Sequence, residues 1–181
     1  MVVSTNFSQV RHIALIVSDV DGVLTNGTVT IHSDGSESKQ FTVEDGAAVA
    51  LARVASIPIA LLSARYSEAT TIRAREMRID YCYQGRLDKL AAFQEICGIY
   101  NLPEERVCYI GDGLVDIPVL EVSGLAVAPE NAHPLVKDIA HIVTARSGGR
   151  GVILETIEFI LQQQERFEAV CKQMRQEIYQ A

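Results

Sequence analysis

The chain has 181 residues, of which 48% are hydrophobic and 22% charged, with 12 Gly and 5 Pro. This composition is typical of a globular chain that buries its own core, and it excludes small domains held together by disulfides or a metal ion. The 16 Lys and Arg against 23 Asp and Glu give a net charge of −7, with no basic stripe. We therefore expect no nucleic acid and no anionic membrane surface as a partner.

The cysteines and the apolar runs bear on the cellular compartment. The four cysteines stand far apart without a C-x-x-C pair, so zinc-ligand spacing and a thioredoxin-like motif are absent. The first ten residues are polar, and no apolar run approaches the length of about 18 residues that a membrane span needs. These features predict a cytoplasmic protein with one domain over 1–181 and with free thiols.

Short apolar runs alternate with longer stretches of helical period along the chain. The expected strands are 12–19, 57–63, 81–83, 107–111, 125–128 and 142–143. The expected helices are 45–55, 66–77, 86–100, 114–123 and 131–138. Strand-length runs that are apolar throughout predict strands buried on both faces. The alternation predicts an α/β fold with an open, doubly wound parallel sheet.

One segment breaks the alternation, at about 27–44. It has β-like runs on both sides of the turn residues 33–36 (SDGS), which predicts a β-hairpin inserted after the first strand. No insertion is long enough to hold a core of its own, so we expect no cap domain.

The last stretch, 151–179, predicts one long helix, because Ile153, Ile160, Phe167 and Met174 recur seven residues apart. This apolar stripe is longer than one small sheet can cover, and we expect part of it to pack against another subunit. A solvated tail after about Gln164 is the alternative.

Polar side chains follow the expected strands at the edge where an open parallel sheet binds its ligand. These candidate site residues are Asp19, Asp21, Ser63, Arg65, Lys89, Asp112 and Asp116. Crowded carboxylates repel one another unless a cation compensates them, and oxygen ligands with open positions suit Mg²⁺. A hydroxyl and an ammonium are groups that hold a phosphoryl group. Together they predict phosphoryl transfer, although singly Ser63 also suits a helix N-cap and Lys89 a solvated helix charge.

The spacing of Asp19 and Asp21 allows both carboxylates to face the crevice where the chain turns away from the strand. One can attack phosphorus while the other acts as general acid and then as general base. Gly22 permits the sharp exit that follows. A calcium loop is the alternative for Asp-x-Asp-Gly, but Val23 and Leu24 occupy the positions that need a ligand and a glycine.

Four runs resemble the motifs of the haloacid dehalogenase superfamily of phosphatases: DVDGVLTNG at 19–27, LLSAR at 61–65, YQGRLDKL at 83–90 and YIGDGLVDIPVL at 109–120. The run AHPLVKDIAHIVTARSGGRG at 132–151 is similar to the small capless branch that acts on acidic sugar phosphates. The resemblance covers about 12–155. It implies a Mg²⁺-dependent phosphoric monoester hydrolase.

The resemblance also implies a role for each residue of the reaction centre. Asp19 is expected to be the nucleophile that forms an aspartyl-phosphate, and Asp21 the acid that protonates the leaving alkoxide and then activates water. The Asp19 carboxylate, the Asp21 main-chain carbonyl and the Asp112 carboxylate are the expected Mg²⁺ ligands. Lys89 is expected to neutralise Asp19, and Asp116 to orient the metal shell or Lys89.

A second group of residues is expected to hold the substrate. Ser63, with Ala64 beside it, would bind the phosphoryl oxygens. Arg65, Arg86 and Arg150 are candidates for contact with a sugar carboxylate. For the arginines, the alternative is a solvated surface charge.

The branch implies a homotetramer in which the hairpins pair into a central barrel and a neighbour completes each active site. The segment 146–150 is similar to the tail that reaches a neighbouring site in that branch. Three positions depart from its usual pattern: Gly113 replaces Asp, Ala64 replaces Gly and Leu154 replaces Arg.

Three other functions remain to be weighed. The expected substrate is 3-deoxy-D-manno-octulosonate 8-phosphate, on the route to lipopolysaccharide, and a nonulosonate 9-phosphate is the alternative. A phospho-accepting receiver module would place its acceptor Asp after a middle strand, whereas Asp19 and Asp21 follow the first strand. Dehalogenases of the superfamily lack the acid that corresponds to Asp21.

Overall fold

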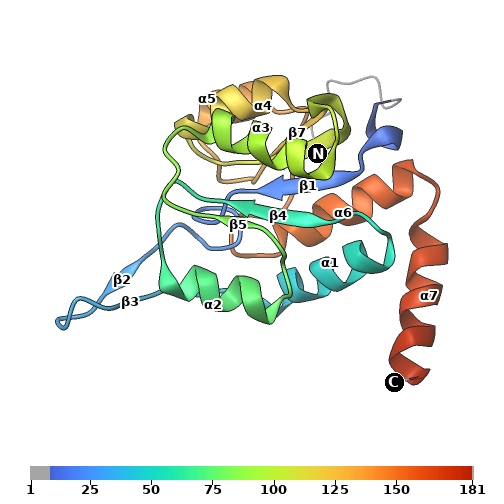
Figure 1. Cartoon of the computed structure of the whole chain (residues 1–181), viewed down its shortest axis with the longest axis horizontal. Coiled ribbons are helices and arrows are strands. Elements are labelled where there is room, and N and C mark those ends of the chain that lie inside the picture. Colours follow the sequence, from blue (N-terminus) through green and yellow to red (C-terminus); the bar gives the residue numbers. More distant parts are fainter. Residues whose placement is uncertain (1–8, 181) are drawn as a thin grey trace.

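The computed structural model describes residues 9–180; residues 1–8 and 181 of the expected 1–181 domain lie outside it. A six-stranded sheet forms the centre, with the order β5-β4-β1-β6-β7-β8 and every neighbouring pair parallel (Figure 1). The strands are β1 Leu15–Ser18, β4 Ile59–Leu62, β5 Cys82–Tyr83, β6 Val107–Ile110, β7 Leu125–Ala128 and β8 Ile142–Val143. Each lies inside a strand expected from the sequence, and the predicted fold class is confirmed.

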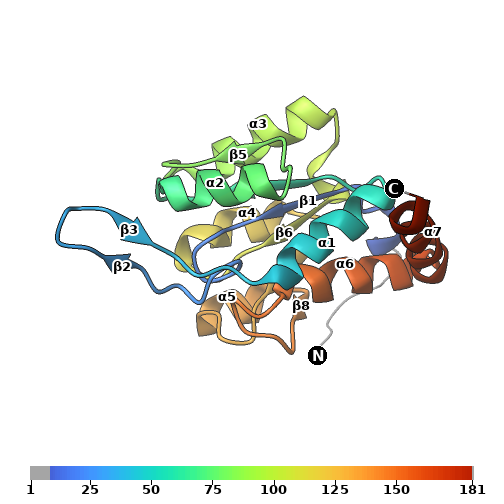
Figure 2. The same ribbon diagram turned by 90° about the horizontal axis from the view of Figure 1, so that it is seen from below.

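Helices cover both faces of the sheet (Figures 1 and 2). They are α1 Val43–Val54, α2 Glu68–Glu76, α3 Lys89–Tyr100, α4 Ile117–Val122, α5 Pro134–Ile139, α6 Val152–Gln163 and α7 Phe167–Gln180. Three short 3₁₀ helices accompany them: Val10–His12, Glu104–Arg106 and Leu114–Asp116. Among the described residues, no helix is both long enough and apolar enough to cross a membrane.

The core lies in two layers because successive side chains of a strand point to opposite faces. In β1, Ile16 joins the cluster against α1 and α6, while Leu15 and Val17 join the cluster against α3 and α4. All four residues of β1 are buried. The central strand is therefore fixed from both sides, and so is the loop that leaves its carboxyl end.

Two helix starts are fixed by side-chain caps. The Thr42 hydroxyl accepts from the Glu44 N–H at 3.2 Å at the start of α1. The Asp88 carboxylate accepts from the Ala91 N–H at 3.1 Å at the start of α3. Because Asp88 caps the helix, Lys89 becomes its first residue and lies at the carboxyl edge of the sheet.

The expected hairpin is present as β2 Thr30–Ile31 and β3 Glu37–Ser38, which pair antiparallel. Gly35 closes its turn with a φ of +85° and donates to the His32 carbonyl at 3.0 Å. The hairpin projects from the body of the molecule (Figures 1 and 2). Among the described residues it is the insertion between β1 and α1, and no cap domain lies there.

The C-terminal segment differs from the expectation of one helix over 151–179. It forms two helices, α6 and α7, separated at Glu165, which has a φ of +57°. The polar residues at the break bond to the body: the Gln164 amide donates to the Ile13 carbonyl at 2.8 Å and the Arg166 guanidinium to the Ala55 carbonyl at 2.6 Å. These bonds turn the chain, and α7 then buries Val170 in the core of its own chain.

Candidate active site

Three neighbouring strands end together at one edge of the sheet. Ser18 of β1 lies beside Leu61 of β4 and Ile110 of β6. Asp19 and Asp21 therefore leave β1 at the same edge as Ser63 leaves β4 and Asp112 leaves β6. The structure brings the expected strand-end residues to this edge, while their catalytic roles remain predictions.

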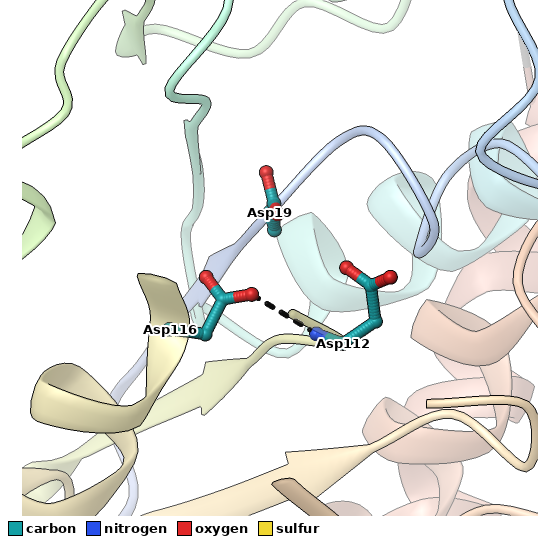
Figure 3. Close-up of side chains that lie close together, drawn as sticks. All are labelled: Asp19, Asp112 and Asp116. Atoms are coloured by element: carbon teal, nitrogen blue, oxygen red, sulfur yellow. Dashed lines mark hydrogen bonds between the residues drawn. The ribbon is translucent and has the colours of Figure 1, made fainter. Parts of the chain in front are cut away.

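Asp19, Asp112 and Asp116 form a cluster in which one carboxylate oxygen from each lies within 4.8 Å of the others. Figure 3 shows their origins: Asp19 follows β1, Asp112 follows β6 and Asp116 ends the 3₁₀ helix that comes next. Asp19 and Asp116 are buried, whereas Asp112 is half-buried. The cluster opens toward solvent on the Asp112 side.

Lys89 lies between two of these carboxylates. Its Nζ is 2.7 Å from Asp19 Oδ2 and 2.6 Å from Asp116 Oδ1, and the residue is only 2% exposed. An ammonium at this position compensates two buried anions at once. The Asp19 Oδ1 atom accepts from the Val20 N–H at 2.6 Å, which fixes the orientation of the carboxylate.

Asp116 uses both of its oxygens within the protein. Its Oδ1 accepts from Lys89 and from the Tyr109 hydroxyl, each at 2.6 Å. Its Oδ2 accepts from the Asp112 N–H at 3.1 Å (Figure 3). The same oxygen accepts from the Gly113 N–H at 2.9 Å. Asp116 thus holds Lys89 with one oxygen and the Asp112 segment with the other. Because the Gly113 contact is made by the main chain, it does not depend on the side chain at position 113.

The three carboxylates of the cluster share one lysine, Lys89, so they lack compensating positive charge. Burial, and then the Asp116 charge, raise the pKa of Asp19 to about 7, although Lys89 opposes the shift. Burial and Asp116 likewise raise the pKa of Asp112 to about 6. Burial lowers the pKa of Lys89, but Asp19 and Asp116 together outweigh it, so the net pKa is raised. A further cation beside Asp19 and Asp112 would stabilise both ionised forms.

The cluster fits a hard divalent cation. Among the described residues, no other residue donates a hydrogen bond to the Asp112 carboxylate, and only the N–H of Asp112 itself contributes one, so its oxygens are available to a ligand. Asp116 is already saturated, which leaves Asp19 and Asp112 as the carboxylates that could hold an ion. All the candidate ligand atoms are oxygens, which are the donors that Mg²⁺ prefers.

The loop after β1 is packed tightly between two other segments. Gly22 has a φ of +96°, and a Cβ atom there would overlap the Asp112 carboxylate. On the other side, a Cβ on Gly148 would overlap the Gly22 carbonyl, and the Gly149 N–H donates to the Val23 carbonyl at 2.9 Å. The glycines of 148–149 therefore lie against the loop of their own chain, and the contact of segment 146–150 with a neighbouring subunit stays a prediction.

Lys39, just after β3 of the hairpin, lies against Asp21. Its Nζ is 2.7 Å from Asp21 Oδ1 and 2.9 Å from Oδ2, and it lies 3.4 Å from the Thr70 hydroxyl. The Lys39 side chain is fully buried by these contacts. Nothing in the sequence predicts this contact, because no local pattern shows which residue a lysine of an inserted hairpin will meet.

The expected substrate-binding residues are placed less uniformly. Ser63 is 1% exposed, and its hydroxyl accepts from the Arg65 N–H at 3.2 Å, with Ala64 between them. The Arg65 guanidinium pairs with Glu37 of β3, so a second ion pair ties the hairpin to this edge.

Arg86 and Arg150 do not contact the carboxylate cluster. Arg86 pairs with Glu95 at 2.5 Å and lies over the Tyr83 ring at 5.6 Å from its centre. Arg150 is exposed and lines a separate cavity of about 550 Å³ at the base of the hairpin. Arg146 pairs with Glu44 at 2.7 Å. Leu154, where the branch usually has Arg, packs against the core.

An open parallel sheet with aspartates and a lysine at its carboxyl edge defines an α/β enzyme with a site for a phosphoryl group and a metal ion. The family described as haloacid dehalogenase-like hydrolase matches residues 56–155. The chain belongs to this family, which confirms the resemblance stated from the motifs.

Named relatives cover most of the chain. It is 38% identical over 157 residues to the 3-deoxy-D-manno-octulosonate 8-phosphate phosphatase KdsC of Yersinia pestis, covering 87% of this chain and 84% of that protein. A crystal structure of the phosphatase of that name from Yersinia pestis superposes with a TM-score of 0.87 at 37% identity, covering 90% and 88% of the two chains.

The corresponding phosphatase from Moraxella catarrhalis was solved with a magnesium ion, a phosphate ion and a KDO molecule. It superposes with a TM-score of 0.88 at 30% identity and covers 92% of this chain and 96% of that one. The predicted class, a phosphoric monoester hydrolase, is confirmed by the family and these relatives. The predicted Mg²⁺ cofactor is confirmed at the level of the family, and the carboxylate cluster of this chain fits it.

Proposed function

We propose that this enzyme hydrolyses 3-deoxy-D-manno-octulosonate 8-phosphate to the free sugar acid and inorganic phosphate. The observation that carries the proposal is the Asp19 carboxylate, buried and paired at 2.7 Å with Lys89 beside the open Asp112 carboxylate. The octulosonate phosphatases named above, which resemble nearly the whole chain, support the choice of substrate.

Asp19 is the nucleophile in this proposal. One of its carboxylate oxygens attacks phosphorus, and the bond between phosphorus and the sugar oxygen breaks as an aspartyl-phosphate forms. Lys89 partly neutralises Asp19 before the attack and stabilises the charge that develops on the phosphoryl oxygens. A fixed positive charge stabilises a developing negative charge most strongly in a site from which water is excluded.

Asp21 carries the proton in both half-reactions. In the first it donates a proton to the leaving sugar alkoxide. In the second it takes a proton from water as that water attacks phosphorus, and phosphate leaves while the Asp19 carboxylate is regenerated. Unlike Asp19, Asp21 is 23% exposed at its side chain and lies next to the hairpin. This places it on the side from which a sugar would enter.

Mg²⁺ would be held by the carboxylates of Asp19 and Asp112 and by the main-chain carbonyl of Asp21. When bound, the ion supplies positive charge next to the phosphoryl oxygens. Asp116 would keep the Asp112 segment in place through its two main-chain hydrogen bonds. Ser63 and the main chain at Ala64 would bind the remaining phosphoryl oxygens.

The acidic group of the sugar needs a cation near Asp21. Arg65 is the candidate that the geometry favours, because its side chain is 45% exposed and it follows Ser63 by two residues. A substrate carboxylate would exchange with Glu37, its present partner. Arg86 and Arg150 could contribute only if their side chains left their observed positions.

We infer a homotetramer in which the projecting hairpin meets neighbouring subunits and a neighbour completes each site. Exposed apolar side chains support this inference: Ile31 on the hairpin is 63% exposed, and Leu87 and Leu114 near the sheet edge are 79% and 53% exposed. Such side chains on one edge are typical of an interaction surface. The four free cysteines support a cytoplasmic location, where thiols remain reduced. Analytical ultracentrifugation measures the assembly, and a monomer would contradict the tetramer.

Phosphate release from a substrate panel tests the proposed function. The panel contains the octulosonate 8-phosphate, a nonulosonate 9-phosphate and an aryl phosphate, each with Mg²⁺ or with EDTA. Asp19→Asn is run beside the native enzyme, and Asp138→Asn, an exposed aspartate on α5, is the matched control.

We expect selective, Mg²⁺-dependent release from the octulosonate that is lost in Asp19→Asn and retained in Asp138→Asn. Preference for the nine-carbon sugar would keep the mechanism and overturn the substrate. Full activity in Asp19→Asn would overturn the mechanism.

A further inference from the structure

The buried hydroxyl of Tyr109 lies directly behind the reaction centre. Tyr109 belongs to β6 and is fully buried, and its ring packs edge-on against Phe93 with 5.8 Å between ring centres. Its hydroxyl lies 2.6 Å from Asp116 Oδ1. An ionised carboxylate only accepts, so the tyrosine is the donor. In sequence Tyr109 looks like one more apolar residue of a buried strand.

The hydroxyl shares its acceptor with Lys89. Asp116 Oδ1 accepts from both the Tyr109 hydroxyl and Lys89 Nζ, while the same Nζ lies 2.7 Å from Asp19. When two donors share one acceptor oxygen, each of the two hydrogen bonds is weaker than it would be alone. The Tyr109 bond therefore weakens the attraction of Asp116 for the ammonium and leaves Lys89 shared between Asp116 and Asp19.

The other oxygen of Asp116 serves a separate segment. Within residues 9–180, Oδ2 accepts only from the N–H groups of Asp112 and Gly113, whereas the bonds from Tyr109 and Lys89 go to Oδ1. Removing the tyrosine hydroxyl would therefore disturb the Lys89 side of the carboxylate and leave the Asp112 side in place. This separation allows the two functions of Asp116 to be measured independently.

We propose that Tyr109 is a positioning residue for the nucleophile, because its hydrogen bond to Asp116 sets how Lys89 is shared between Asp116 and Asp19. The inference rests on the proposed role of Asp19 in catalysis. Without the hydroxyl, Lys89 moves toward Asp116, and Asp19 loses part of its compensating charge. Asp19 remains available as a Mg²⁺ ligand, and the Asp112 segment stays in place because the other oxygen of Asp116 holds it.

Tyr109→Phe tests the proposal, with Tyr100→Phe as the matched control. The Tyr100 hydroxyl is buried and bonds to no other described residue, so its loss removes the same atom without breaking a bond. Steady-state kinetics are measured with rates normalised to folded protein, together with the Mg²⁺ concentration for half-maximal activity.

For Tyr109→Phe we expect a fall in kcat of about tenfold, with KM and the Mg²⁺ requirement each changed by less than about twofold. Tyr100→Phe should match the native enzyme. In the Asp116→Asn background, Tyr109→Phe should cause no further loss, because the carboxylate through which it acts is gone.

Three results would overturn the proposal: native kcat in Tyr109→Phe, an equal loss in Tyr100→Phe, or losses that multiply in the double variant. A Mg²⁺ requirement that rises as much as kcat falls would also overturn it, because an Asp19 with less compensating charge would not bind the cation more weakly and the Asp112 segment must then have been displaced. Failure of the proposed function is distinct, because the native enzyme would then release no phosphate.

Discussion

The two aspartates that leave β1 are paired with lysines in contrasting ways. Asp19 pairs with Lys89, which begins a helix of the central fold and is shared with the buried Asp116. Asp21 pairs with Lys39, which comes from an inserted hairpin that projects into solvent. The first pair is enclosed by the core, whereas Asp21 retains 23% exposure.

The two pairs correspond to the two functions that the proposed reaction needs: attack on phosphorus by Asp19 and proton transfer by Asp21. Attack on phosphorus needs fixed charges, and the fold supplies them from strand ends and a capped helix. Proton transfer needs access to the sugar and to water, and Asp21 keeps an exposed surface beside the projecting hairpin. We therefore predict that removing Lys89 lowers both stability and activity, whereas removing Lys39 lowers mainly activity.

Lys89→Met should have the largest effect. It leaves Asp19 and Asp116 buried without a cation, and breaking such a pair typically lowers the free energy of unfolding by about 3–5 kcal/mol. We also expect turnover to fall by at least about a thousandfold. Urea unfolding and phosphate release measure the two losses. Lys172→Met, on the exposed face of α7, is the control, and a stability loss no larger than that of the control would contradict the account.

Gly22→Ala should rank second. The positive φ of Gly22 strains any other residue by about 1–3 kcal/mol, and the added Cβ would displace the Asp112 carboxylate. Gly35→Ala is the matched control, since its φ is +85° but nothing lies within 4 Å of the added atom. Both variants should lose similar stability, but Gly22→Ala alone should weaken Mg²⁺ binding, which calorimetry measures. Equal Mg²⁺ affinity in the two variants would show that Asp112 is not a ligand.

Lys39→Met should lower kcat/KM by about tenfold and should lower the free energy of unfolding by less than Lys89→Met does, because Asp21 is partly exposed whereas Asp19 and Asp116 are buried. Asp21 loses its partner but can be solvated from the open side. Urea unfolding of Lys39→Met and Lys89→Met under the same conditions measures the two losses in free energy of unfolding. A stability loss as large as that of Lys89→Met would show that the Asp21–Lys39 pair stabilises the fold as much as the Asp19–Lys89 pair does.

The pH dependence of stability tests the charge balance of the cluster around Lys89. The pKa of Asp19 is raised from 3.8 to about 7 and that of Asp112 from 3.8 to about 6. The folded protein therefore holds protons that the unfolded chain has released. The stability of the metal-free protein should fall as pH rises from about 4 to 7 because of these groups.

Mg²⁺ needs both carboxylates ionised, so its stabilising effect should grow over the same pH range. Thermal unfolding with and without Mg²⁺ at several pH values measures both trends. Asp112→Asn should flatten them. A Mg²⁺ effect independent of pH would contradict the raised pKa values.

The strand-end half of this site could be predicted from the sequence. Asp19, Asp112 and Lys89 each follow a strong local signal, a buried strand or a capped helix start, and parallel strands carry such residues to one edge. The hairpin was also predictable from its turn residues. Local patterns sufficed because the sheet itself determines where these residues lie.

The remainder depends on tertiary contacts that no local pattern encodes. The contact of Lys39 with Asp21 follows from how the hairpin leaves the body, and the Tyr109 hydroxyl is hidden in an apolar strand. The helix break at Glu165 depends on bonds from Gln164 and Arg166 to distant carbonyls. Arg86 was expected at the substrate, yet it pairs with Glu95 of the helix that follows it, α3.

Covalent trapping tests the central claim, that Asp19 is the nucleophile and Asp21 the proton carrier. Asp21→Asn is mixed with an aryl phosphate, whose leaving group needs no acid, and the reaction is quenched in acid and digested for mass spectrometry. We expect one phosphoryl group on the peptide that contains Asp19, since water is no longer activated. A phosphoryl group on another peptide, or none while phosphate is released, would contradict the account.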